Sequence, residues 1–204
     1  MSTREAIAAP SQPRWVFETE QFRIYRLQVY NWGTFSGLHE IPISEKGFLF
    51  VGGSGSGKTT LLDAFASLLI PPRWVEFNAA ARDAEGGRRD RNLVSYIRGA
   101  WAAQKEEDSG LIATQHLRKE TTWSALALSY RNGEGRNVAL VQLFWIKGSG
   151  NTSADVKRHY FIFNREFNLR EMEVFRDENL DIRKLKLKQS FQDVFDRDSF
   201  ESYR

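Results

Sequence analysis

The sequence contains no cysteine, and this absence excludes disulfide bonds and metal sites built on thiolates, so a reducing cytosol is its natural compartment. Long apolar runs are also missing. No stretch approaches the roughly 20 residues that a membrane-spanning helix needs, and the N-terminus lacks the apolar core of a secretory signal. We therefore expect no contact with a membrane. An excess of one charge is absent too: the net charge is only +3, so any contact with nucleic acid must come from local basic patches.

Metal-ligand clusters are equally scarce. The three histidines, His39, His116 and His159, are isolated, and no carboxylate accompanies them at a metal-binding spacing. What is present is an ordinary globular composition, with 41% hydrophobic residues in a chain of 204. That is enough for one domain with a substantial core.

One segment carries recognisable chemistry, because residues 52–59 fit the phosphate-loop pattern G-x-x-x-x-G-K-[ST]. Glycines let a tight loop turn its backbone N–H groups inward onto phosphate oxygens, and the start of the following helix adds its positive dipole end. We predict Lys58 at the β- and γ-phosphates, where it is also the catalytic candidate, and the Thr59 hydroxyl on Mg²⁺. Thr60 either donates to the α-phosphate or simply starts the helix. The predicted nucleotide-binding set is Gly52, Gly53, Ser54, Gly55, Ser56, Gly57, Lys58, Thr59 and Thr60.

The flanks of this loop have the pattern that the motif requires. Residues 46–51 form a short apolar run, which predicts a buried strand. After the loop, apolar residues recur at helical spacing, and the prolines at 71 and 72 end the predicted helix. The residues of that apolar stripe are Leu61, Leu62, Phe65, Leu68 and Leu69. The alternative, a flexible Gly/Ser linker, does not explain this context.

Before the loop, residues 1–14 are small and polar, and we predict a disordered leader over residues 1–21. Residues 22–30 alternate, which predicts a half-buried strand, and 31–34 turn it toward a partner strand over 35–43. After the loop, 77–87 predict a loop. A helix is expected from Asn92, because Leu93, Ile97 and Trp101 are spaced four apart.

The second half predicts an antiparallel meander with strands at 123–130, 137–146 and 156–164. A hairpin turn is indicated at 132–135, and Leu126 and Leu128 are expected to face Val141 and Leu143 or their register neighbours. Beyond 164 the pattern mixes short strand and helix. A capping box at 198–201 begins a helix with no room to continue, so we expect the chain to be a fragment of a longer protein.

These features together resemble the N-terminal lobe of ABC-type ATPase heads, an α/β P-loop fold with a mixed sheet and an antiparallel β-meander. More narrowly, the chain is similar to the SMC-like heads of the MukB/MksB type, and most of all to the JetC-type ATPases of Wadjet anti-plasmid systems. The stretches that carry the resemblance are Leu-Gln-Val-Tyr-Asn-Trp-Gly-Thr-Phe at 27–35, the phosphate loop, Leu-Ile-Pro-Pro at 69–72 and Gly-Arg-Arg-Asp-Arg-Asn-Leu at 87–93.

The resemblance implies that residues 22–204 are the first lobe of a head that binds ATP and Mg²⁺. The C-terminal lobe, reached across a coiled coil, would supply the Walker B acid, the catalytic glutamate and the signature motif, none of which this sequence contains. Two heads would close on ATP as a homodimer and drive DNA binding and loop extrusion in the cytoplasm, associated with the nucleoid. Implied partners are DNA, kleisin-like and accessory subunits, and a nuclease in the Wadjet case.

Further residue roles follow from the same resemblance. Asn31 and Trp32 would border the nucleotide, with the adenine against the indole; the alternative is a core or lobe-interface tryptophan. Basic residues would contact the DNA backbone, the alternative being a solvated charged loop; the candidates are Arg88, Arg89, Arg91 and Arg98. Two other functions stay open at this point: a self-contained P-loop kinase or GTPase, and a non-catalytic module that docks a partner. A chromosome-condensing role is the alternative to plasmid defence.

Overall fold

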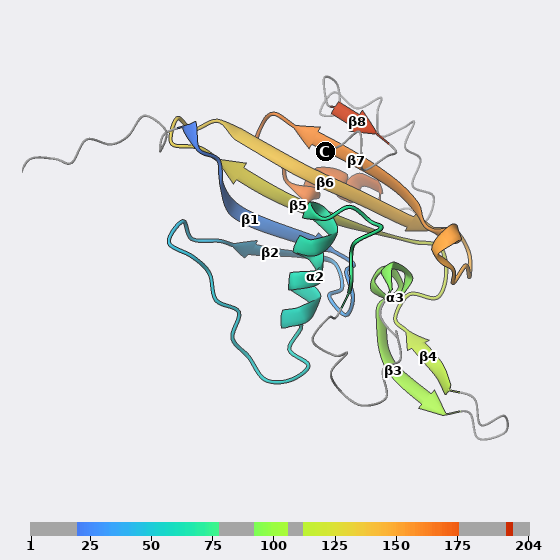
Figure 1. The fold of residues 1–204 in the computed structure, drawn as a ribbon. Helices are drawn as coiled ribbons and strands as arrows, with labels where there is room; N and C mark the ends of the chain where they lie inside the picture. Colours follow the sequence, from blue (N-terminus) through green and yellow to red (C-terminus); the bar gives the residue numbers. More distant parts are fainter. Residues whose placement is uncertain (1–19, 78–91, 106–111, 176–194, 198–204) are drawn as a thin grey trace, which may run out of the picture.

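The computed structural model describes residues 20–77, 92–105, 112–175 and 195–197, which leaves most of the predicted leader and the capping box at 198–201 outside the described residues. Its centre is a six-stranded sheet in the order β2-β1-β5-β6-β7-β8 (Figure 1). Every pairing in this sheet is antiparallel, so the predicted mixed sheet is not found in the described part of the chain. The strands are β1 (Arg23–Tyr30), β2 (Leu38–Pro42), β5 (Thr122–Arg131), β6 (Asn137–Ile146), β7 (Lys157–Phe163) and β8 (Phe195–Arg197).

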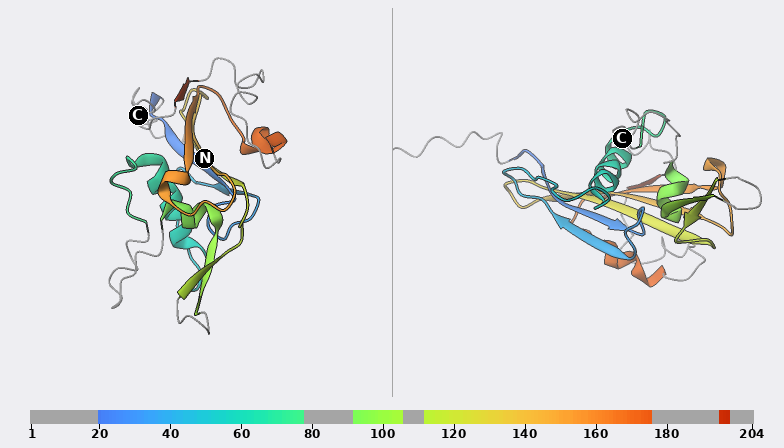
Figure 2. Two further views of the ribbon diagram at one scale, coloured as in Figure 1. Left: turned by 90° about the vertical axis from the view of Figure 1, so that its right-hand side faces the viewer. Right: turned by 90° about the horizontal axis from the view of Figure 1, so that it is seen from below.

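Both faces of the sheet are covered. The helices α2 (Lys58–Leu69) and α3 (Leu93–Arg98) pack on one face, and the 3-10 helix η3 (Leu169–Phe175) lies on the other (Figure 2). The prediction that β1 is half-buried is therefore wrong for its centre. Gln28 points away from α2 and is fully buried under η3. Its amide is satisfied there, because it donates to Glu40 and Asn168 and accepts from the backbone N–H at the start of η3.

The meander is confirmed. β5 and β6 form a hairpin, with a further antiparallel step to β7 after the short helix η2 (Ser153–Asp155). In the observed register, Leu126 lies opposite Gln142 and Leu128 opposite Leu140. Val141 and Leu143 belong to the core on the other face, so only the register-neighbour form of the predicted pairing is correct.

The predicted helix at Asn92 is confirmed at its start and wrong at its end. The Asn92 side chain accepts from the backbone N–H of Ser95, which makes it the N-cap of α3. The helix stops at Gly99, whose left-handed backbone (φ 67°) turns the chain into β3 (Ala100–Lys105). β3 pairs with β4 (Ile112–His116), and this two-stranded sheet extends away from the main one (Figure 1). Trp101 is therefore on a strand, 62% exposed, rather than on the predicted helix.

The apolar run at 46–51 is the largest departure from the prediction. It forms no strand, and Leu49 and Val51 are 77% and 82% exposed. Among the described residues no strand pairs with it, so it has no ladder to join, although its Phe50 packs against the main core. The helix after the loop forms as predicted and ends at Leu69, with Ile70 as its C-cap, before the two prolines. Leu62 and Leu69 of its predicted stripe are nevertheless exposed.

Candidate functional site

Two glycines of the loop at 52–57, Gly55 and Gly57, are favoured by the backbone conformation of the loop. Gly55 and Gly57 have φ values of 79° and 89°, a region that residues with a side chain rarely occupy. A Cβ on Gly57 would lie 2.7 Å from the Phe35 ring, and a Cβ on Gly52 would lie 2.7 Å from the Ser56 hydroxyl oxygen. Of the two fixed glycines, Gly57 is required by both the Phe35 ring and its left-handed backbone, whereas at Gly52 the Ser56 side chain could rotate away.

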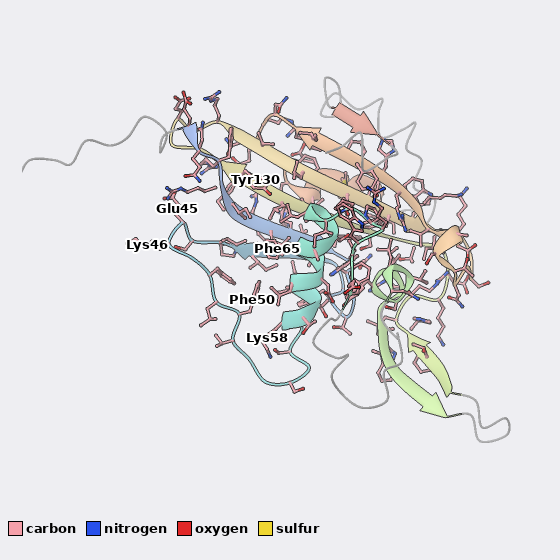
Figure 3. All side chains as sticks on the ribbon, viewed as in Figure 1. Glu45, Lys46, Phe50, Lys58, Phe65 and Tyr130 are labelled. Atoms are coloured by element: carbon pink, nitrogen blue, oxygen red, sulfur yellow. The ribbon has the colours of Figure 1, made fainter. Side chains whose placement is uncertain are left out.

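The side chain of Lys58 folds back onto the phosphate loop that precedes it. Its Nζ donates to the carbonyl oxygens of Gly52 and Gly53, both at 2.7 Å, and to the Ser56 hydroxyl at 3.3 Å. Lys58 is also the first residue of α2, at the lower end of that helix in Figure 3, and no acidic residue occupies the helix's first turn. The ammonium group and the helix N-terminus therefore place positive charge at one point, which fits a phosphate group.

Trp32 is a core residue, so the predicted contact with adenine is wrong and its alternative is confirmed. The side chain is fully buried and stacks on Tyr96, with ring centroids 4.6 Å apart. Its indole Nε1 donates to the carbonyl oxygen of Thr60 at 2.9 Å. The tryptophan thus packs under the first turn of α2, where it supports the helix that follows the loop.

Asn31 also has a structural role, and its predicted contact with the nucleotide stays a prediction. Its backbone is left-handed (φ 49°), and its side-chain oxygen accepts from the backbone N–H of Gly37 at 2.9 Å. The side-chain nitrogen donates to the carbonyl oxygen of Trp123 at 3.3 Å. The amide oxygen therefore closes the turn between β1 and β2, and the amide nitrogen ties that turn to β5.

Three polar residues on the buried face of α2 hold the helix in place. The Thr60 carbonyl accepts from Trp32, Asp63 accepts from the Tyr96 hydroxyl, and Ser67 exchanges two hydrogen bonds with Gln142 of β6. The sequence prediction missed this role. The available signal was the polar side chains of Asp63 and Ser67, which are spaced four apart inside an otherwise apolar stripe; the Thr60 contact uses a backbone carbonyl and had no such signal. The predicted contact between the Thr60 hydroxyl and an α-phosphate stays a prediction.

Arg98 is a buried structural residue, whereas the prediction placed it on the surface as a contact to DNA. Its side chain is 1% exposed, and its guanidinium donates to backbone carbonyl oxygens in two segments, Arg118 to Glu120 and Gly148 to Gly150, at 2.7–3.1 Å. Burial lowers its pKa, partly offset by the carboxylates of Glu120 and Asp155. The other three predicted DNA contacts, Arg88, Arg89 and Arg91, lie outside the described residues.

A family model for the P-loop containing region of AAA domain matches residues 24–84. The matched stretch begins in β1 and contains β2, the loop and α2. A search of curated proteins found no match. The chain thus has a P-loop NTPase-like domain, of the kind that binds nucleotides. Within the described residues no cluster of histidine and acidic side chains could hold a metal ion, and no helix there is long and apolar enough to cross a membrane.

Proposed function

We propose that this chain is the ATP- and Mg²⁺-binding lobe of an SMC-like ATPase head. The observation that carries the proposal is the Lys58 ammonium, held by the loop's own carbonyl oxygens beside the N-terminus of α2. The backbone N–H groups of the loop and Lys58 would bind the β- and γ-phosphates, and the Thr59 hydroxyl would bind Mg²⁺. When bound, Mg²⁺ would neutralise part of the negative charge on the phosphates. The family match over the loop supports nucleotide binding, and the resemblance at 27–35 and 69–72 supports the narrower assignment.

The exposed run at 46–51 supports a domain that is completed by another part of the protein. Leu49 and Val51 are the most exposed large apolar residues in the described part of the chain. Covering each would contribute about 1.5–3 kcal/mol. We infer that residues 22–204 form an N-terminal lobe, whose run at 46–51 becomes a strand when a C-terminal lobe lies beside it. That second lobe would also bring the catalytic acids and the signature motif.

In the complete protein, two heads would close on ATP and drive DNA binding and loop extrusion. Kleisin-like and accessory subunits would link the heads, and a nuclease partner would act on circular plasmids. Chromosome organisation by a MukB/MksB-like ATPase is the alternative role, and it uses the same nucleotide site. Both roles rest on the sequence resemblance alone.

A nucleotide titration with and without Mg²⁺ tests the site. Lys58→Ala removes a charge-assisted contact worth about 1.5–3 kcal/mol, so ATP affinity should fall by roughly 10- to 150-fold. Thr59→Ala should remove the part of the affinity that depends on Mg²⁺ and leave the rest. Lys46→Ala is the matched control, because Lys46 is an exposed lysine in the segment before the loop. Equal ATP binding by the wild type and Lys58→Ala would rule out this site.

An ATPase assay tests the claim that the domain is incomplete. The chain alone should bind ATP but hydrolyse it at a rate close to background, because it lacks the water-positioning acid. Adding the remainder of the protein in trans should raise the rate. Strong hydrolysis by the chain alone, abolished by Lys58→Ala, would instead indicate a self-contained NTPase. Absence of any nucleotide binding would indicate a docking module.

A further inference from the structure

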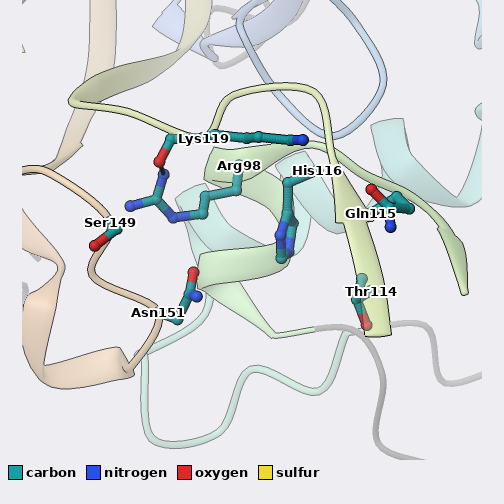
Figure 4. A pocket seen from close by; sticks show the side chains of 7 residues that line it. All are labelled: Arg98, Thr114, Gln115, His116, Lys119, Ser149 and Asn151. Carbon is teal, nitrogen blue, oxygen red and sulfur yellow. Dashed lines mark hydrogen bonds between the residues drawn. The ribbon is translucent and has the colours of Figure 1, made fainter. Parts of the chain in front are cut away.

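A polar cavity of about 280 Å³ lies where the end of α3 meets β4 and the connection between β6 and β7 (Figure 4). No acidic side chain lines it. This volume is just below the roughly 300–1,000 Å³ of pockets that hold drug-sized ligands, so it suits one small group rather than a whole nucleotide. The lining residues are Arg98, Thr114, Gln115, His116, Lys119, Ser149 and Asn151.

Arg98 both builds the cavity and makes it electropositive. Its guanidinium ties the segment 118–120 to the segment 148–150, so the walls on either side are fixed by one side chain. Its partners are neutral carbonyl oxygens. In the described part of the chain no carboxylate forms an ion pair with Arg98, although Glu120 and Asp155 act on it at longer range. A cation whose charge is not cancelled by contact raises the potential of a cavity beside it.

The remaining lining supplies hydrogen-bond donors. Within the described residues, the side chains of Lys119, Ser149 and Asn151 make no hydrogen bond with other protein groups. In Figure 4, Ser149 and Asn151 line the cavity from the connection between β6 and β7, and His116 lines it from the side of β4, with the Arg98 side chain between Ser149 and His116. An ammonium, a hydroxyl, an amide and an imidazole around one small space match the oxygens of a tetrahedral anion.

We propose that this cavity binds a phosphate group, either of a small phosphorylated molecule or of a nucleic-acid backbone. Lys119 pairs with the charge of the anion, and Asn151, Ser149 and His116 donate to its oxygens. Arg98 is a positioning residue that holds the walls. The state of His116 agrees with a cavity that favours anions, since burial, followed by Arg98, Arg118 and Lys119, lowers the pKa of its imidazole.

NMR of the His116 imidazole tests the proposal, with two probes titrated separately: inorganic phosphate and a short DNA duplex. The protein carries Lys58→Ala throughout, so the phosphate loop does not respond and the outcome is independent of the function proposed for that loop. Binding should shift the His116 signals and raise the imidazole pKa. Lys119→Gln should weaken the response at least tenfold, about 1.4 kcal/mol. Lys157→Gln, which removes an exposed lysine outside the cavity, should match the parent.

The two probes also separate the sources of the phosphate. A response to inorganic phosphate alone assigns a small phosphorylated ligand, and a response to the duplex assigns a nucleic-acid backbone. Either supports the site, provided that Lys119→Gln removes the response and Lys157→Gln does not. No shift of the His116 signals with either probe would overturn the proposal. So would a response that Lys119→Gln leaves unchanged.

Discussion

Replacing Arg98 by lysine should destabilise the protein even though the charge is kept. The guanidinium reaches five backbone carbonyl oxygens in two segments. A lysine ammonium is a single nitrogen at the end of its stem, so it can serve only one of the segments. If three of the five hydrogen bonds are lost at a net value of about 1 kcal/mol each, Arg98→Lys lowers the free energy of unfolding by about 3 kcal/mol.

Urea unfolding and thermal denaturation followed by circular dichroism measure this effect. For a domain of this size, a loss of about 3 kcal/mol corresponds to a fall in Tm of roughly 6–12 °C. Arg136→Lys is the control. Arg136 is an exposed residue of the β5–β6 hairpin with a surface ion pair to Glu134, and such pairs are worth about 0–1 kcal/mol. If Arg98→Lys unfolds within about 0.5 kcal/mol of the wild type, like a surface change, the carbonyl contacts do not hold the two segments together.

Three further changes have defined outcomes. Gly57→Ala should abolish nucleotide binding in a titration, because the new Cβ meets the Phe35 ring and the backbone is left-handed; Gly53→Ala, where a Cβ meets nothing within 4 Å, should bind normally. Trp32→Phe should keep the stacking but lose the hydrogen bond under α2, and should cost about 2 kcal/mol in thermal denaturation. The folded-state pKa of His116 lies below its ordinary 6.5, so the free energy of unfolding should fall as pH drops from about 6.5 through that folded-state value. In urea titrations across this range His116→Gln should show a smaller slope, and an unchanged slope would contradict the lowered pKa.

The phosphate loop and its helix could be predicted because the information is local. The glycine positions, Lys58 and the apolar spacing after it all lie within a few turns of chain, and α2 forms where they place it. The hairpin between β5 and β6 was predictable for the same reason. In each case the residues that fix the conformation are neighbours in sequence.

What the sequence could not reveal was which groups lie against which. Trp32 and Arg98 have the residue types of a ligand contact, but their roles depend on hydrogen-bond partners 20 to 52 residues away. Trp101 continued a helical spacing that Gly99 had already ended, since spacing records apolar positions and not backbone conformation. The apolar run at 46–51 predicted a strand, but a strand also needs a neighbour with which to pair, and the run itself carries no information about that neighbour.

The phosphate loop is held by hydrogen bonds and close packing on its helical side, and by the packing of Phe50 on the side of residues 46–51. On the helical side, Phe35 packs against Gly57 and Trp32 supports Thr60, whereas residues 46–51 on the other side have no ladder. Ordering residues 46–51 costs conformational entropy. Either a bound nucleotide or a neighbouring strand can order them, and whichever binds second then no longer has to meet this cost. Because such linkage is reciprocal, each should raise the affinity for the other by the same factor, so the loop should bind most tightly when both are present.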